Sequence, residues 1–171
     1  FPNGVAIKSG QVLKNAKLAA VYRSLATDGV DAFYQGWIAK KIVSAVQNSA
    51  IAPGRLTLAD MKNYRAQELP AVCGPYHQYK VCGMAPPSSG GVAVIQILGQ
   101  LENFDLAKLS MAEPEFTHLF TQSSRLAFAD RNRYIADSNF VSVPTNGLVD
   151  RTYMAKRGML INPNKDMGMA M

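Results

Sequence analysis

The sequence is poor in the residues that build metal sites. It contains two cysteines and two histidines among 171 residues. These four residues lie too far apart, and in too irregular a pattern, to give a recognisable ligand spacing for zinc or a related metal. We therefore expect no metal site. A phosphate loop of the Walker type is also missing, because no Gly-Lys-Ser/Thr follows the glycine-rich stretch, and we expect no cofactor.

Long apolar runs are missing as well. No stretch approaches the roughly 18 residues needed to cross a bilayer, so we expect no membrane span and a soluble chain. Glycine and proline, at 13 and 9 residues, are too few and too irregularly spaced for a collagen-like or low-complexity chain. A hydrophobic fraction of 48% with 18% charged residues is instead typical of a globular domain with its own core.

Positive charge exceeds negative charge but is not concentrated. Eighteen Lys and Arg against twelve Asp and Glu give a formal net charge of +6. The longest cationic run is Lys40-Lys41, and the densest cluster, Arg125, Arg131 and Arg133, includes an aspartate. A nucleic-acid-binding face usually collects its cations on one stripe with exposed aromatic residues between them. We therefore expect a solvated basic surface and no nucleic-acid partner.

Hydrophobic periodicity and turn residues predict an α+β fold that is mainly helical and has one β-hairpin. Thr57 and Asp60 are spaced as a capping box at the start of a short helix. Pro114 suits the first turn of a long helix. Helices are expected over residues 12–27, 31–46, 57–64, 92–104, 115–134 and 150–160, the hairpin over 71–84, and a frayed tail over 162–171.

The predicted hairpin brings the two cysteines together. If His77 and Gln78 form a two-residue loop, residues whose numbers sum to 155 face each other, and Cys73 faces Cys82. This pair falls at a non-hydrogen-bonded position, where Cα atoms approach to about 4.5 Å, a distance within the range of a disulfide. The alternative is two small buried thiols on one face of the sheet. A disulfide would indicate an oxidising compartment such as a periplasm.

The stretch best suited to binding or catalysis is residues 88–91, which are Ser88, Ser89, Gly90 and Gly91. Two hydroxyls and unhindered amides before a helix could hold an anion or an oxyanion, but we favour the structural interpretation, a helix cap with glycines that permit close packing. We expect His118 to be a partly exposed helical histidine, His77 to be solvated at the hairpin tip, and Asp130 and Arg131 to join a structural ion-pair network. No complete active site follows from the residue types.

Four ordered blocks resemble the γ-glutamyltransferase family, whose members are also called γ-glutamyltranspeptidases or glutathione hydrolases. Residues 31–39 resemble its D-x-F-Y-x-G-x-I-A segment, and residues 56–64 its L-T-x-x-D-L-x-x-Y segment. Residues 76–91 resemble Y-x-G-Y-x-V followed by P-P-S-S-G-G, and residues 127–144 resemble A-x-A-D-R-x-x-Y-x-G-D-x-x-F with a later V-P. Gln78 stands where the family usually has Gly, so we expect the turn to require a positive φ at Gln78.

The resemblance implies part of an N-terminal-nucleophile hydrolase with an αββα sandwich, made as a precursor that cuts itself into two subunits. A Thr at the start of the small subunit would take a γ-glutamyl group from glutathione or a similar small donor and pass it to water or an amine. The family's glutamyl-binding Arg lies before residue 1, and the Thr and its Gly-Gly oxyanion loop lie after residue 171. We therefore expect no catalytic residue in this chain.

The same resemblance implies that the chain is the C-terminal part of the large subunit. Residues 1–161 would form the partial large-subunit region and 162–171 a linker-like tail. Its partners would be the missing N-terminal part of the large subunit and the small subunit, in a periplasmic or secreted enzyme. Two alternatives stay open: a non-catalytic binding module derived from the family, and a related acylase that acts on cephalosporin side chains or poly-γ-glutamate.

Overall fold

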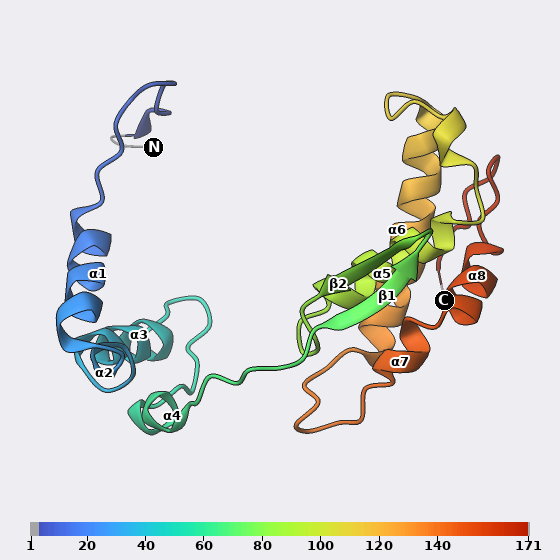
Figure 1. The fold of residues 1–171 in the computed structure, drawn as a ribbon. Coiled ribbons are helices and arrows are strands. Elements are labelled where there is room, and N and C mark those ends of the chain that lie inside the picture. Colours follow the sequence, from blue (N-terminus) through green and yellow to red (C-terminus); the bar gives the residue numbers. More distant parts are fainter. Residues whose placement is uncertain (1–3, 171) are drawn as a thin grey trace. The chain divides into compact units, whose positions relative to one another are not determined.

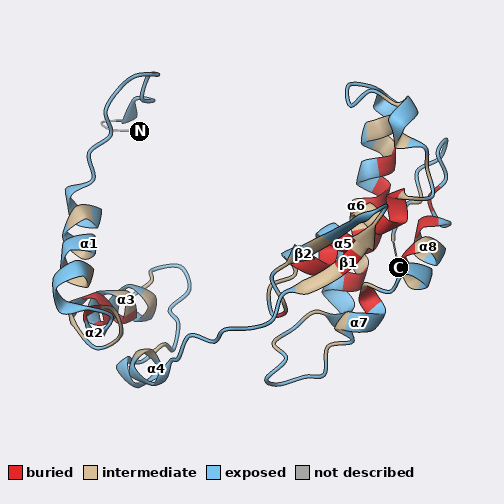
Figure 2. Ribbon diagram, in the orientation of Figure 1, coloured by how far each residue is buried: buried red, intermediate tan, exposed pale blue. Residues whose placement is uncertain are grey.

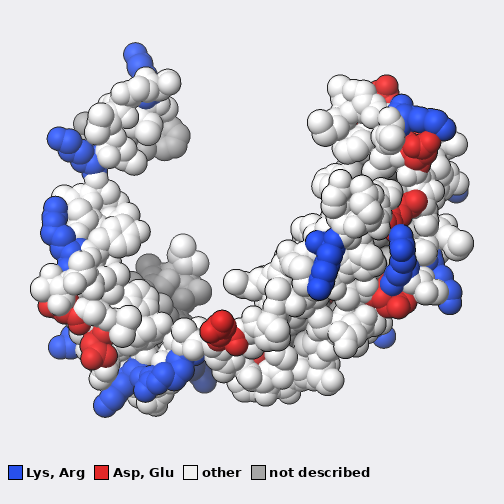
Figure 3. Space-filling view, in the orientation of Figure 1, with Lys and Arg blue, Asp and Glu red and all other residues white. Residues whose placement is uncertain are grey.

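Residues 4–170 are described by a computed structural model, in which the chain divides into two units, Phe1–Gln67 and Glu68–Met171 (Figure 1). The described residues are rich in helix and contain one two-stranded sheet, which is the α+β character expected from the sequence. None of the helices described between residues 4 and 170 is long and apolar enough to cross a bilayer. On the face drawn in Figure 3, Lys and Arg occupy separate small groups with acidic residues between some of them.

Local capping sets where the helices of the first unit begin. The side chain of Asn15 accepts a hydrogen bond of 2.9 Å from the Leu18 N–H at the start of the first helix. Thr57 and Asp60 form both bonds of a capping box, which confirms the predicted start of the fourth helix. The helices are α1 (Ala16–Asp28), α2 (Asp31–Tyr34), α3 (Trp37–Gln47) and α4 (Leu58–Asn63).

The single helix predicted over residues 31–46 is wrong, because the chain breaks it into α2 and α3 at Gly36. The N–H groups of Gln35 and Gly36 both donate to the Asp31 carbonyl, at 2.8 and 2.9 Å, and this closes α2 after one turn. A Cβ atom at Gly36 would lie 2.8 Å from the Ala32 carbonyl oxygen. Glycine at this position therefore permits a turn that a side chain would obstruct.

The second unit is built on two packed helices that carry most of its buried residues (Figure 2). A buried apolar cluster, Leu101, Leu119, Leu126 and Ile161, joins α5 and α6 to the residues after α8. The elements are β1 (Val72–Tyr76), β2 (Tyr79–Gly83), α5 (Gly90–Leu101), a 3₁₀ turn (Leu106–Lys108), α6 (Pro114–Tyr134), α7 (Thr145–Leu148) and α8 (Arg151–Gly158).

The hairpin has the predicted register, with residues summing to 155 opposite each other. Cys73 and Cys82 are joined by a disulfide, with their Cα atoms 4.1 Å apart. The positive φ of the turn lies at His77, at 49°, so the expectation that Gln78 would adopt it is wrong. The first loop residue therefore carries the unusual conformation, and the residue that replaces the usual glycine does not.

One face of the hairpin lies directly against α5. An added Cβ at Gly74 would lie 2.3 Å from Ile95 Cγ2, and one at Gly83 would lie 2.5 Å from the Gly91 Cα. Two glycines of the hairpin and one of the helix thus allow their backbones to approach more closely than side chains would permit. This contact fixes the position of the Pro-Ser-Gly loop that connects β2 to α5.

Candidate functional site

The loop before α5 contains the stretch that the sequence marked as the candidate site, residues 88–91. Ser89 is the N-cap residue of α5, but its side chain makes no capping bond. Its Oγ instead accepts a hydrogen bond of 3.3 Å from Arg131 Nε on α6. Ser88 donates its N–H to the Ala85 carbonyl at 3.1 Å, which closes the turn that leads into the helix. Ser89 thus occupies the N-cap position expected for this stretch, while its side chain ties the loop to α6.

The two glycines of this loop differ in what they require. A Cβ on Gly91 would lie 2.5 Å from the Met84 carbonyl oxygen and 2.8 Å from the Gly83 carbonyl carbon. On Gly90 the nearest atom would be Ser88 Oγ at 3.9 Å, an ordinary van der Waals distance. Gly91 is therefore needed for the contact between hairpin and helix, whereas Gly90 occupies an open position at the exposed start of α5.

A buried carboxylate on α6 organises the second unit. Asp130 is 4% exposed and its Oδ2 accepts from Gln96 Nε2 at 2.9 Å and from the Tyr153 hydroxyl at 2.8 Å. Its Oδ1 forms an ion pair of 2.9 Å with Arg157 on α8. Gln96 also donates to the Leu148 carbonyl, at 3.1 Å. One carboxylate thus links α5, α6 and α8, so that the expected ion-pair network exists around Asp130.

Burial and the Asp130 carboxylate together keep Tyr153 protonated. Desolvation raises its pKa, and the hydrogen bond to Asp130 raises it further, to about 12. A phenol with that pKa donates a hydrogen bond to the carboxylate throughout the physiological range and does not serve as a base. The network is therefore suited to holding three helices in place, because Gln96, Tyr153 and Arg157 all donate to the same carboxylate.

The hairpin tip is attached to the end of α5 through Glu102. The His77 N–H donates to Glu102 Oε1, and its ring nitrogen Nδ1 lies 3.8 Å from the same oxygen. Arg151 at the start of α8 contacts the other carboxylate oxygen at 3.2 Å. The His77 side chain is 56% exposed, as expected for a solvated tip, but it also contacts a half-buried carboxylate. These contacts hold the turn in place.

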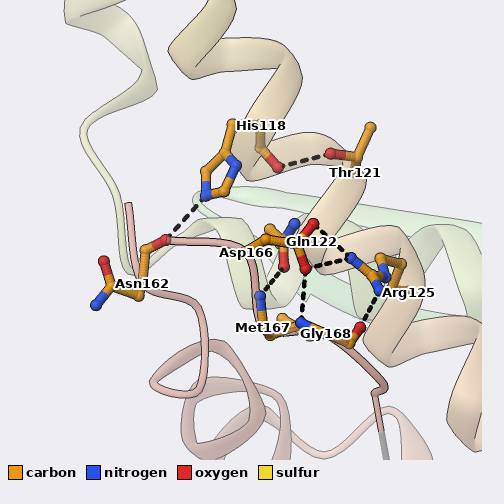
Figure 4. Close-up of polar contacts among 8 residues, drawn as sticks. All are labelled: His118, Thr121, Gln122, Arg125, Asn162, Asp166, Met167 and Gly168. Atoms are coloured by element: carbon orange, nitrogen blue, oxygen red, sulfur yellow. Dashed lines mark hydrogen bonds and ion pairs between the residues drawn. The ribbon is translucent and has the colours of Figure 1, made fainter. Parts of the chain in front are cut away.

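Residues 162–170 lie along one side of α6 (Figure 4). His118 Nε2 is 2.9 Å from the Asn162 carbonyl oxygen, and Gln122 Oε1 accepts from the Met167 N–H at 3.0 Å. Arg125 pairs with Asp166 through distances of 2.8 and 3.0 Å and also donates to the Gly168 carbonyl. The three helical residues are spaced at i, i+4 and i+7, so they present one face to the segment.

The prediction of a frayed tail is therefore wrong for residues 162–170. Met167 and Ala170 also pack against the apolar cluster of the second unit, which adds burial to the polar contacts. Hydrogen bonding by the Gly168 N–H, followed by the Arg125 guanidinium, lowers the pKa of Asp166 below its usual value. His118 is half-buried, and its ring holds the start of this segment.

These groups do not converge on one reactive centre. Among the hydrogen bonds of residues 4–170, none joins Ser88 or Ser89 to either histidine. In the same part of the chain, no three His, Cys, Asp or Glu side chains are placed to hold a metal ion. The polar contacts instead connect secondary-structure elements to one another, so their role is structural.

Comparison with known families gives the arrangement an identity. A model of the family described as γ-glutamyltranspeptidase matches residues 1–170. The chain belongs to the γ-glutamyltranspeptidase family. Over 165 residues it is 36% identical to the glutathione hydrolase proenzyme of Escherichia coli K12, and this match spans 96% of this chain and 28% of that protein. It is 35% identical to the glutathione hydrolase proenzyme of Bacillus subtilis 168, over 95% of this chain and 27% of that protein.

Solved structures of this family have the same fold over nearly the whole chain. The γ-glutamyltranspeptidase of Helicobacter pylori is 33% identical, with a TM-score of 0.75 over 95% of this chain and 46% of that one. The γ-glutamyltranspeptidase of Pseudomonas nitroreducens is 29% identical, with a TM-score of 0.75 over 93% of this chain and 47% of that one. The chain thus spans slightly more than a quarter of the length of the curated relatives it matches.

Sequence reasoning found part of this γ-glutamyltranspeptidase scaffold and missed the rest. It identified Asp130 as a member of a structural network, but not its partners Gln96, Tyr153 and Arg157. The spacing of Tyr153 and Arg157, four residues apart on a predicted helix, was the available signal for a shared acceptor. Arg131, expected in the same network, instead bonds Ser89 and the neighbouring Asn132 side chain.

Proposed function

We propose that this chain is the C-terminal part of the large subunit of a γ-glutamyltransferase or glutathione hydrolase. The complete protein would move a γ-glutamyl group from glutathione to water or an amine through a Thr nucleophile outside this chain. The observation that carries the proposal is 36% identity to a glutathione hydrolase proenzyme across 96% of the chain, in the same fold as solved γ-glutamyltranspeptidases.

In this proposal the chain supplies a wall of the enzyme and no catalytic residue. The hydroxyl of the nucleophilic Thr attacks the γ-glutamyl carbonyl, its own α-amino group accepts the proton, and the amine of the donor leaves. Water or an acceptor amine then releases the γ-glutamyl group from the Thr oxygen. Ser88, Ser89, Gly90 and Gly91 have a structural role, since Gly91 lies against the hairpin backbone and Ser89 is bonded to Arg131.

The same relationship supports the rest of the architecture. We infer that the two-stranded sheet belongs to an αββα sandwich completed by the remainder of the protein, with residues 162–171 as the segment that leads from residues 1–161 toward the processing point. The names of the relatives, which are proenzymes, support cleavage into two subunits. A periplasmic or secreted location agrees with the Cys73–Cys82 disulfide, which persists in oxidising compartments.

The test is glutamate release from glutathione by the complete protein. We expect cleavage of its precursor, release of glutamate, and transfer to an added amine acceptor. The matched controls are the 171-residue chain alone and the complete protein with its processing Thr replaced by Ala, both of which should release none. A complete, cleaved protein that leaves γ-glutamyl amides intact would refute the proposal, and activity in the 171-residue chain would refute the absence of catalytic residues.

A related acylase is the second candidate. The chain is 34% identical to the acylase ACY 1 proenzyme of a Pseudomonas strain, over 94% of this chain and 28% of that protein. The two candidates differ in the acyl group they accept, and so the same assay with a cephalosporin side-chain amide or poly-γ-glutamate separates them. Turnover of one of these with no turnover of glutathione would favour the acylase. Binding of γ-glutamyl compounds without turnover would favour a non-catalytic module.

A further inference from the structure

The excess of positive charge belongs entirely to the first unit. Residues 1–67 contain nine of the eighteen Lys and Arg but only three of the twelve Asp and Glu, so their formal charge is +6. Residues 68–171 contain nine of each sign and are formally neutral. A charge difference of this kind between two parts of one chain suggests binding to a polyanion or to a membrane surface.

The two units also differ in how their charges are paired. All nine cationic side chains of the first unit are exposed, and within residues 4–67 none of them lies in an ion pair. In the second unit four cations each pair with a carboxylate, namely Lys108, Arg125, Arg151 and Arg157. The cations of the first unit are therefore available to an anion from outside the chain.

The three aspartates of the first unit are engaged in local helix contacts. Asp28 accepts a hydrogen bond of 2.9 Å from Ser24 Oγ, and Asp31 accepts one of 3.0 Å from Gln35 Nε2. Asp60 belongs to the capping box of α4. Every donor in these contacts is neutral, so none of the three carboxylates neutralises a Lys or Arg by direct contact.

Exposed aromatic side chains accompany the cations on α1 and α3. Trp37 is 39% exposed, and Lys41 Nζ lies 5.2 Å from the centroid of its ring. The Trp37 indole N–H donates to Ser24 Oγ at 3.0 Å, which places this pair beside α1. On α1 itself Tyr22, 62% exposed, precedes Arg23. Aromatic side chains with a polar tip, flanked by cations, suit the headgroup level of an anionic bilayer.

Exposed aliphatic side chains favour a lipid surface over a nucleic acid as the partner. Val12 and Leu13, before α1, are 77% and 70% exposed, and Leu18 on α1 is 45% exposed. Lys14 and Lys17 lie among them in the sequence. Single-stranded nucleic acids offer phosphates and base rings to a protein. A helix that combines cations with aliphatic and aromatic side chains instead lies in the interface of an anionic bilayer.

We propose that the first unit binds the surface of an anionic lipid bilayer. Its lysines and arginines contact the lipid headgroups, and Tyr22 and Trp37 lie at the headgroup level. The proposal goes beyond the proposed function, because it concerns where the protein is held and not the reaction it performs. Each Lys or Arg near an anionic membrane strengthens binding about fivefold. The attraction falls off within a Debye length, about 10 Å at 0.1 M salt.

Vesicle sedimentation with the complete protein tests the proposal. We expect binding at low salt to vesicles of phosphatidylglycerol and phosphatidylcholine in equal parts, and no binding to phosphatidylcholine alone. In about 1 M salt, where the Debye length is about 3 Å, binding should be weaker by about tenfold or more. Absence of binding to the anionic vesicles would overturn the proposal. Tighter binding to an oligonucleotide or heparin at the same salt would also overturn it, since the partner would then be a soluble polyanion.

Two variants with the same change in net charge separate the first unit from a general attraction. Replacing four lysines of the first unit by Gln should weaken vesicle binding by about a hundredfold or more; these are Lys14, Lys17, Lys40 and Lys41. The matched control replaces the four lysines of the second unit by Gln, and should weaken binding by less than about fivefold. These are Lys80, Lys108, Lys156 and Lys165. Equal losses in the two variants would overturn the proposal.

Two further measurements separate lost charge from lost folding. Replacing the same four lysines of the first unit by Arg keeps the charge and should keep vesicle binding, and loss of binding in this folded variant would refute the electrostatic argument. Trp37 is the single tryptophan among the 171 residues. The emission that differs between the complete protein and its Trp37→Phe variant should therefore be quenched by vesicles with brominated acyl chains. An unquenched signal from vesicle-bound protein would refute the placement of Trp37 at the headgroups.

Discussion

Replacing Asp130 with Asn should remove a large part of the stability of the second unit. The carboxylate is 4% exposed, and the side chain of its partner Arg157 is 13% exposed. Loss of the negative charge removes the carboxylate with which Arg157 pairs at 2.9 Å, in a site from which most water is excluded. Breaking a buried ion pair from one side typically costs about 3–5 kcal/mol.

The hydrogen-bond geometry adds to this cost. An Asn side chain has one oxygen and one NH₂ group, so it cannot accept from Tyr153, Gln96 and Arg157 in the way that two carboxylate oxygens do. One donor must then face another donor. Since a domain is stable by only about 5–15 kcal/mol, a loss of about 3–5 kcal/mol would remove a fifth or more of its stability.

Urea unfolding followed by far-ultraviolet circular dichroism measures the change. The matched control is Asp105→Asn, which breaks an exposed pair of 2.8 Å with Lys108 and should cost about 0–1 kcal/mol. Replacing Asp130 by Asn and Arg157 by Met together should cost less than the sum of the single changes, because the two side chains contact each other directly. A loss below about 1 kcal/mol for Asp130→Asn would refute the reasoning.

Three further outcomes follow from local contacts. Gly91→Ala should destabilise the second unit by about 1–3 kcal/mol in urea, whereas Gly90→Ala should be neutral or slightly stabilising, and equal effects would contradict the packing argument. The pKa of Asp166 is lowered in the folded chain, so its ionised carboxylate stabilises the docked segment above the ordinary aspartate pKa, and this stabilisation is lost as the pH falls below that value. Proteolysis within residues 162–170 should therefore become faster in acid, and a cleavage rate that does not change with pH would contradict this. Replacing Cys73 and Cys82 by Ser should lower stability by about 2–3 kcal/mol relative to the oxidised chain, and unchanged urea midpoints would show that the bond adds nothing.

Local rules predicted those parts of the fold that depend on neighbours in sequence. The hairpin register follows from a two-residue loop, and the start of α4 follows from the capping box of Thr57 and Asp60. The break at Gly36 was missed because the residues on either side of it have the apolar pattern of one continuous helix. Only the close approach of Gly36 to the Ala32 backbone shows why the helix ends there.

Contacts between distant residues were beyond these rules. Asp130 meets Gln96, Tyr153 and Arg157 across separations of 34, 23 and 27 residues. The spacing of Tyr153 and Arg157 indicates a shared acceptor, but it does not show that the acceptor is Asp130. The docking of residues 162–170 was missed for a similar reason, because their polar composition is typical of a loose end while their partners lie on α6.

The docked segment changes how a continuing chain would behave as a tether. A flexible segment of the length of residues 162–170 would let its far end wander by about 15–18 Å. Contacts with His118, Gln122 and Arg125 remove most of that freedom, so a chain that continues past residue 170 starts from a fixed point beside α6. Any group farther along the chain then explores a smaller volume around that point, and this raises its effective concentration at sites on the second unit.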